Sequence, residues 1–208
     1  MVPHMDGRTR RRLATHERVL KSARALLAKR GFDGVGLGEI AATAGVSRQA
    51  VYAHHFATKR DLLLALLDHV ERVEGFAELI PPAFEAPTGV EALRIGVAGN
   101  AEFEHRISDV TRVLDAARRS DPIAAEAWLD RTGKKRAGIG ELLERIEREG
   151  ALRAGWTAEK ASDLVFALLS GGFIDLLVVE RRWSVEACAE ATWQVIEGTL
   201  LAAPDGGG

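Results

Sequence analysis

The sequence is poor in the features that define several classes of protein. Its 208 residues include a single cysteine, Cys188, so no disulfide can form within one chain, and this fits a reducing compartment. The N-terminal "MVPHMDGRTRRR" has no apolar segment of the kind that a secretory signal requires. The longest apolar stretch, residues 164–179, contains Asp175 and is shorter than a membrane span. We therefore expect a cytoplasmic protein with no membrane partner.

Motifs for common enzyme and cofactor chemistry are also missing. The sequence has no nucleophile elbow, phosphate-binding loop or kinase signature. Gly34, Gly36 and Gly38 have the wrong spacing for a dinucleotide fingerprint, and helix-type sequence precedes them instead of a strand. His54 and His55 are adjacent, so on a helix they point about 100° apart and do not converge on one metal. The sequence thus predicts no catalytic residues, no cofactor and no metal site.

The net charge of −2 conceals an asymmetry along the chain. Residues 1–60 hold 12 Lys and Arg against 4 Asp and Glu, whereas residues 61–208 hold 16 against 26. A basic segment joined to an acidic remainder is typical of a polyanion-binding domain attached to a domain with another task. The arginine run over residues 8–12, at the start of the chain's first helix-type segment, can act as a flexible arm that reaches a DNA groove or phosphates, or form a solvated tail. The candidates for DNA contact in this run are Arg10, Arg11 and Arg12.

The residue pattern predicts an all-α protein. Ala, Leu, Glu and Arg dominate, and no stretch alternates apolar and polar residues as a half-buried strand does. The stretch "PPAFEAPTG" is the clearest loop, because a double proline does not fit inside a helix. The expected helices cover residues 10–30, 37–44, 47–55, 59–79, 89–106, 109–119, 122–149, 157–180 and 185–202.

Two short helices are expected on either side of Gly45, in the arrangement of a helix-turn-helix. Gly45 suits the left-handed conformation that ends one helix, and Ser47 can cap the next. The second helix of such a motif enters the DNA major groove, where its first residues meet base edges. Arg48 can bind guanine, Gln49 can bind adenine, and the Ala50 methyl can contact a thymine methyl. The Ser47 hydroxyl and the free N–H groups at the helix start suit a phosphate oxygen.

The stretch "GEIAATAGVSRQAVYAHHFATKRDLL", with "VLKSARALLAKRGFDG" before it, resembles the DNA-binding domain of the tetracycline-repressor (TetR-type) family of transcription factors. The resemblance extends from Val19 to Leu66. It implies an all-α homodimer that has N-terminal three-helix, helix-turn-helix heads and a C-terminal helical body for ligand binding and dimerisation. It also implies that Tyr52 and Lys59 contact phosphates and that residues 48–50 contact bases.

Two features depart from the family pattern. The family commonly has Ser or Thr before the second helix, where this chain has "GVGLGE" and only a glycine as cap. The family's Tyr and Phe are three residues apart, whereas Tyr52 and Phe56 are four apart. This extra residue leaves open whether His54 or His55 takes the family's histidine position beside the phosphates. It predicts an irregular or extended end of the third helix, and a regular helix with Phe56 in the core is the alternative.

Aromatic residues are spread over separate parts of the chain after residue 80, and five of them are candidates for a ligand site. In an all-helical body they either line a cavity between helices or belong to the core. The family resemblance favours a cavity for an unknown small-molecule effector. The candidates are Phe84, Phe103, Trp128, Phe166 and Phe173.

The helix expected over residues 157–180 is apolar on nearly all sides, so it has to be covered on every face. Ser170, Gly171 and Gly172 allow close approach, and the helix over residues 185–202 is its natural neighbour. Two such helices from each of two protomers would make the four-helix interface of a homodimer. The alternative is a helix buried in the centre of a monomer.

Together these features predict a flexible basic arm over residues 1–9, a helix-turn-helix DNA-binding domain over 10–58, a ligand-binding and dimerisation domain over 59–203, and a disordered tail over 204–208. The predicted function is that of a transcriptional regulator, most often a repressor. It would bind a pseudo-palindromic double-stranded DNA operator until a small-molecule effector releases it. The alternative from another class is an all-helical small-molecule-binding protein or enzyme whose DNA-binding head is non-functional.

Overall fold

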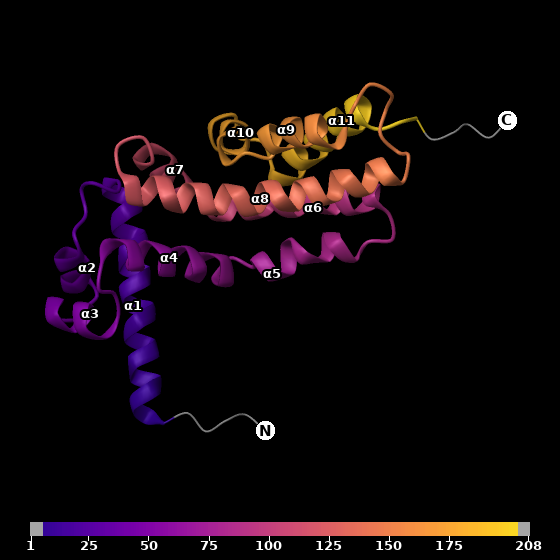
Figure 1. The fold of residues 1–208 in the computed structure, drawn as a ribbon. Coiled ribbons are helices and arrows are strands. Elements are labelled where there is room, and N and C mark those ends of the chain that lie inside the picture. The colour runs from indigo at the N-terminus through magenta and orange to yellow at the C-terminus, as the bar shows by residue number, and fades with distance from the viewer. Residues whose placement is uncertain (1–5, 204–208) are drawn as a thin grey trace. The chain divides into compact units, whose positions relative to one another are not determined.

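The computed structural model describes residues 6–203, apart from the side chain of His54, and consists of helices joined by short turns (Figure 1). Within residues 6–203 no β-strand forms, although Leu152 and Leu201 make one antiparallel bridge. The expected all-α class is therefore confirmed. The helices are α1 (Gly7–Arg30), α2 (Leu37–Thr43), α3 (Arg48–His54), α4 (Lys59–Val73), α5 (Phe76–Leu79), the 3-10 turn η1 (Pro81–Glu85), α6 (Gly89–Arg106), α7 (Ser108–Ala117), α8 (Pro122–Arg148), α9 (Ala158–Leu168), α10 (Gly171–Asp175), the π turn η2 (Leu176–Glu180) and α11 (Val185–Leu200).

The described part of the chain divides into two compact units. The N-terminal unit comprises the residues up to Val70 together with Arg112–Trp128, and the C-terminal unit comprises Glu71–Thr111 together with the residues from Leu129 onward. Helices α4, α7 and α8 each contribute residues to both units. The domain borders predicted from the sequence stay predictions.

Helix α1 begins at Gly7, three residues earlier than predicted. The Asp6 carboxylate accepts the backbone N–H of Arg8 at 3.3 Å and so caps the helix. Residues 7–9 of the predicted flexible arm are therefore helical, and its first five residues lie outside the described part, as does the predicted tail over 204–208. One face of α1 is buried in the N-terminal unit, where α1 packs against α2; its buried residues are Val19, Leu20, Ala23 and Leu27.

The single helix predicted over residues 59–79 is wrong, because the chain forms two helices there. Gly75 adopts a left-handed conformation with φ of +82° and separates α4 from α5. The sequence did not reveal this break, because an isolated glycine inside a helical pattern is often tolerated. The predicted proline loop contains η1, which has a proline in its first turn, where the missing N–H costs no hydrogen bond.

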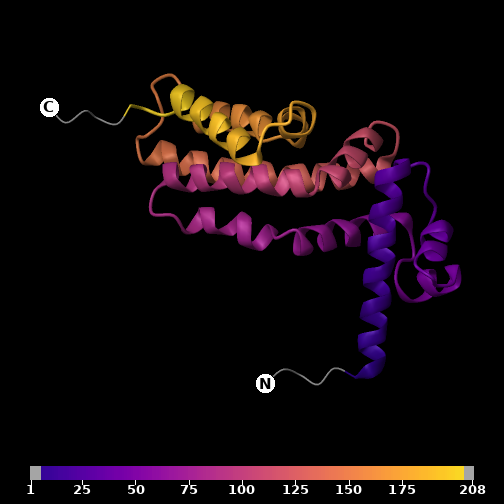
Figure 2. The same ribbon diagram turned by 180° about the vertical axis from the view of Figure 1, so that it is seen from behind.

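The core of the C-terminal unit lies between α6, α8, α9 and α11 (Figure 2). Helix α6 packs directly against α5, η1, α10 and α11. Gly99 permits the closest of these contacts, since a Cβ on it would lie 2.1 Å from the carbonyl oxygen of Leu79. Large apolar side chains from all four helices fill this core, including Leu93, Val97, Leu143, Ile146, Val165, Trp193 and Ile196.

The helix predicted over residues 157–180 is also broken. Helix α9 ends at Leu168, and the Ser170 hydroxyl accepts the Phe173 N–H at 3.3 Å to start α10. Among the described residues no single helix is both long and apolar enough to cross a membrane. The segments α9 and Gly171–Glu180 meet the length and composition criteria only as a pair bent by 41°. Leu176 and Val179 of η2 are exposed, so this chain by itself does not cover the segment on every side.

Candidate DNA-binding surface and effector cavity

The turn between α2 and α3 has the conformation that the sequence predicts. Gly45 has φ of +67°, and the N–H groups of Gly45 and Val46 donate to carbonyls of α2 at 3.1 and 3.0 Å. This pair of hydrogen bonds is the Schellman arrangement, which ends a helix at a left-handed glycine. The Ser47 hydroxyl accepts the Ala50 N–H at 3.0 Å and caps α3. Backbone conformation and one side-chain cap thus set the path of the chain from α2 into α3.

One face of α3 points away from the core of the N-terminal unit. Val51 is fully buried and fixes the inner face, whereas Arg48, Gln49 and Tyr52 are exposed. Arg48 Nη2 donates to the Tyr52 hydroxyl at 3.4 Å, and its guanidinium carbon lies 5.4 Å from the centre of the Tyr52 ring. Ala50 is half-buried. The exposed face of α3 therefore carries hydrogen-bonding side chains that suit base edges and phosphates.

The extra residue between Tyr52 and Phe56 widens the last turn of α3. The N–H groups of His55 and Phe56 both donate to the Val51 carbonyl, at 3.0 and 2.8 Å. The second of these bonds spans five residues, as in a π turn. Phe56 is only 2% exposed, so its ring still reaches the core. The predicted irregular end of this helix is confirmed.

Two predicted DNA contacts are turned toward the protein. The His55 ring is half-buried, and its centre lies 5.6 Å from the His16 ring. Lys59 Nζ donates to the Phe32 carbonyl at 2.7 Å and lies 3.7 Å from the centre of the Phe32 ring. The sequence could not show this, because Phe32 follows α1 and meets Lys59 only in the folded unit. The other predicted positions differ: Arg10, Arg11 and Arg12 are exposed in the first turns of α1, and the side chain of His54 lies outside the described part.

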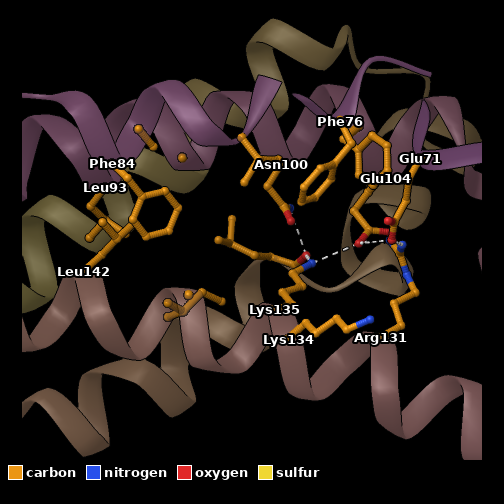
Figure 3. Close-up of a pocket in the computed structure, with 17 residues that line it drawn as sticks. Glu71, Phe76, Phe84, Leu93, Asn100, Glu104, Arg131, Lys134, Lys135 and Leu142 are labelled. Carbon is orange, nitrogen blue, oxygen red and sulfur yellow. Dashed lines mark hydrogen bonds and ion pairs between the residues drawn. The ribbon is translucent and has the colours of Figure 1, made fainter. Parts of the chain in front are cut away.

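The C-terminal unit contains a cavity of about 280 Å³ (Figure 3). Its wall comes from the end of α4, α5, η1, α6, α8 and the residue after α9. Two of the five predicted aromatic residues, Phe84 and Phe103, line it. The two ends differ in Figure 3: Phe84, Leu93 and Leu142 gather at one end, and Glu71, Glu104, Arg131 and Lys135 gather at the other.

The other three predicted aromatic residues lie elsewhere. Trp128 belongs to the N-terminal unit, with the guanidinium carbon of Arg118 4.7 Å from its ring centre. Phe166 packs on the main core of the C-terminal unit, under the guanidinium group of Arg136 at 5.4 Å. Phe173 packs on the small buried cluster around Cys188. The structure therefore brings only Phe84 and Phe103 of the five together in the cavity.

A buried ion cluster closes the polar end of the cavity. The Glu104 side chain is 4% exposed, and its Oε1 accepts hydrogen bonds from Lys135 Nζ and Arg131 Nη2, each at 3.0 Å. The Thr111 hydroxyl donates to Glu104 Oε2 at 3.4 Å, and Arg131 Nη1 lies 3.7 Å from Glu71 Oε1. Burial raises the pKa of the Glu104 carboxyl, but the charges of Lys135 and Arg131 outweigh burial and hold it below its ordinary value. Burial lowers the pKa of Lys135, and the Glu104 charge opposes this effect.

The same cluster holds the break between α9 and α10. Asn100 Nδ2 donates to the Leu169 carbonyl at 3.0 Å, and Lys135 Nζ donates to the same oxygen. A Cβ on Gly171 would lie 2.9 Å from Glu104 Oε2, so the glycine lets α10 start directly against the carboxylate. A carbonyl at the end of α9 thus has polar partners inside the protein.

Sequence reasoning missed the ion cluster, because no short motif contains it. A signal was present, since Asn100 and Glu104 on α6 and Arg131 and Lys135 on α8 are each spaced i, i+4 and share a helix face. Only the fold brings the two pairs together. Among the described residues, no group of three or more His, Cys, Asp or Glu side chains is placed to hold a metal ion.

Helix α3 follows a glycine turn, is capped, and exposes an Arg and a Gln in its first turn. These features are those of the recognition helix in a helix-turn-helix DNA-binding protein. Residues 19–66 match the family described as "Bacterial regulatory proteins, tetR family". The chain is 28% identical to the HTH-type transcriptional repressor BepR of Brucella suis, over 77% of this chain and 79% of that one. It is 25% identical to the HTH-type transcriptional repressor AcnR of Corynebacterium glutamicum, over 89% of this chain and 92% of that one.

A solved structure shares the fold: the SmeT–triclosan complex aligns with a TM-score of 0.73 at 21% identity, over 93% of each chain. The chain therefore carries a TetR-type DNA-binding domain over residues 19–66, and it is similar to these two repressors and to this fold along most of its length. It is accordingly a DNA-binding regulator of transcription, with a helix-turn-helix head and a helical C-terminal body.

Proposed function

We propose that the protein is a homodimeric repressor whose α3 helices bind a pseudo-palindromic operator and which a small molecule in the cavity releases. The observation that carries the proposal is the exposed Arg48 and Gln49 pair in the first turn of the capped helix α3. BepR and AcnR are named repressors, which supports repression here. We place the protein in the cytoplasm, where its DNA would be.

On the operator, Arg48 and Gln49 contact base edges, and the Ala50 methyl lies at the edge of that contact. Ser47, Tyr52 and the N–H groups at the start of α3 bind phosphates. Lys59 stabilises the N-terminal unit through the Phe32 carbonyl. His54, His55 and Lys59 stay predicted contacts with DNA phosphates. The exposed arginines of α1 add attraction for the DNA backbone that does not depend on sequence. These are Arg10, Arg11 and Arg12.

The dimer forms through the last helices, over about residues 157–180 and 185–202. The described chain leaves large apolar side chains exposed there, which is unfavourable in water and is relieved by a second copy. The exposed side chains include Leu176, Val179 and Val195, and Trp183 lies exposed between the two segments. The break at Ser170 is compatible with this proposed interface, because α9 and η2 both pack against α11.

The cavity of the C-terminal unit is the effector site, and Phe84 and Phe103 are the predicted aromatic residues that would contact the effector. The structure of SmeT, which has the same fold, holds the small molecule triclosan. The charged side chains at the polar end of the cavity form ion pairs with one another. We infer that the cavity binds the effector without converting it chemically.

The experiment begins with ligands that raise the Tm of the free protein. Operator affinity is then measured by fluorescence anisotropy with and without such a ligand, and ligand affinity is measured with and without operator. We expect the ligand to weaken operator binding and the operator to weaken ligand binding by the same factor, because the coupling is reciprocal.

The control is a shuffled duplex of the same composition, which the protein should bind about 10³-fold or more weakly than the operator. Equal affinity for both duplexes would contradict sequence-specific binding. A ligand that leaves operator affinity unchanged would contradict release by an effector.

A further inference from the structure

We propose that the cavity takes an organic anion with an apolar body and a single carboxylate head, and that Arg131 and Lys135 bind this head. The inference rests on the proposed effector role of the cavity and names the chemistry of its ligand. It is carried by the distribution of charge and of hydrogen-bond donors around the cavity.

The shape of the lining fits a ligand with two different ends (Figure 3). Phe84, Leu93 and Leu142 form an apolar end, and burying apolar ligand surface there stabilises the complex. The ion cluster closes the other end. A ligand that fills the cavity therefore places one end among aliphatic and aromatic groups and the other against charges.

The polar end has more buried positive than buried negative charge. Arg131 and Lys135 have side chains only 13% and 18% exposed, and they share one buried carboxylate, that of Glu104. Glu71 is 38% exposed and lies 3.7 Å from Arg131, so water screens its charge. A buried charge without a full partner is costly, and a ligand anion would supply the missing partner.

The polar end also offers donors. The Lys135 ammonium has three N–H groups and directs two of them to Glu104 Oε1 and to the Leu169 carbonyl. The Arg131 guanidinium has five N–H groups and donates to Glu104 through Nη2. Both residues line the cavity, and an arginine can hold a carboxylate through two parallel hydrogen bonds.

A cationic ligand fits this end poorly. The buried carboxylate already binds two cations, so a ligand cation would have to displace one of them and leave its charge unpaired. An uncharged head would leave the excess positive charge in place.

The test compares three ligands with one body and different heads: 4-butylbenzoate, 4-butylbenzyl alcohol and 4-butylbenzylamine. Their dissociation constants for the full chain are measured by isothermal titration calorimetry without DNA. We expect the benzoate to bind about tenfold or more tightly than the alcohol and the amine, as a charge-assisted hydrogen bond allows.

Two variants test where the carboxylate head of the ligand binds. Lys135→Met and Arg131→Met each leave one cation for Glu104, and either variant that folds, by circular dichroism, should lose the preference for the benzoate. Lys21→Met changes an exposed lysine of α1 in the other unit and should keep it. If neither variant folds, the comparison of the three ligands on the unaltered chain still decides.

Equal or tighter binding of the alcohol or the amine would overturn the inference, and so would the absence of any binding by the benzoate. Tight benzoate binding that leaves operator affinity unchanged would support the inference while contradicting effector release. The two proposals therefore fail separately.

Discussion

At the scale of single residues, the exposed side chains of α3 and the buried ion cluster of the cavity differ in how far the sequence predicts them. The sequence predicted that Arg48 and Gln49 lie exposed in the first turn of α3. This was possible because the glycine turn and the Ser47 cap determine locally where the helix begins. The sequence could not place Glu104 between Lys135 and Arg131, since that contact joins α6 to α8. Local chemistry was therefore predictable, and the cavity's ion cluster was not.

Arg48→Ala should weaken operator binding by about 1–3 kcal/mol and relax the sequence preference at one base pair of each half-site. The reason is the loss of a side chain that can bind guanine through two hydrogen bonds. The measurement is anisotropy on operators that vary at single positions. Arg148→Ala, an exposed arginine at the end of α8, is the control, and an equal loss in both variants would speak against base contact by Arg48.

Glu104→Gln should lower the free energy of unfolding by an amount that decreases in acid. Because the cations lower the pKa of Glu104 in the folded state, its contribution is complete above the ordinary carboxyl pKa of 4.5 and is lost as the pH falls through the lower folded value. The difference in free energy of unfolding between wild type and variant should therefore be constant near neutral pH and shrink in acid.

The measurement is urea unfolding of both proteins from about pH 7 to pH 3. Glu141→Gln, an exposed carboxylate of α8, serves as the control and should show no such trend. A difference for Glu104→Gln that stays constant throughout would mean that the carboxylate is not stabilised in its charged form.

At the scale of elements, helix existence was predictable and helix continuity was not. The glycine turn before α3, the Asp and Pro start of α8 and the whole of α6 followed the sequence pattern. The breaks at Gly75 and Ser170 were missed, because apolar residues continue on both sides of each. There the packing of α6 against α5 and α10 decides the course of the chain.

Gly45→Ala should destabilise the head, because a non-glycine residue in the left-handed region costs about 1–2 kcal/mol. With φ of +67° at this turn, the change should lower the Tm and weaken operator binding together. Gly133→Ala is the matched control: it lies in α8 with no atom within 4 Å of its Cβ position, and it should raise stability slightly. A Gly45→Ala variant as stable as the wild type would contradict the role of this turn.

At the scale of the whole molecule, the proposed function requires two protomers. Val195→Glu places a charge on a side chain of α11 that is 49% exposed in one chain and lies in the proposed interface. We expect this variant to sediment as a monomer and to lose specific operator binding, since one head reaches only one half-site.

Leu129→Glu is the matched control, because Leu129 of α8 is 69% exposed and lies outside the proposed interface. It should remain a dimer by analytical ultracentrifugation. If Val195→Glu also remains a dimer with unchanged operator affinity, the last helices do not form the interface.

The central claim is that this chain binds specific DNA through two copies of α3. Its most direct test is selection of bound duplexes from a random pool by the purified protein, followed by sequencing. The account predicts an inverted repeat with half-site centres about one helical turn or somewhat more apart. Sequences without a shared motif, or one unrepeated half-site, would contradict it.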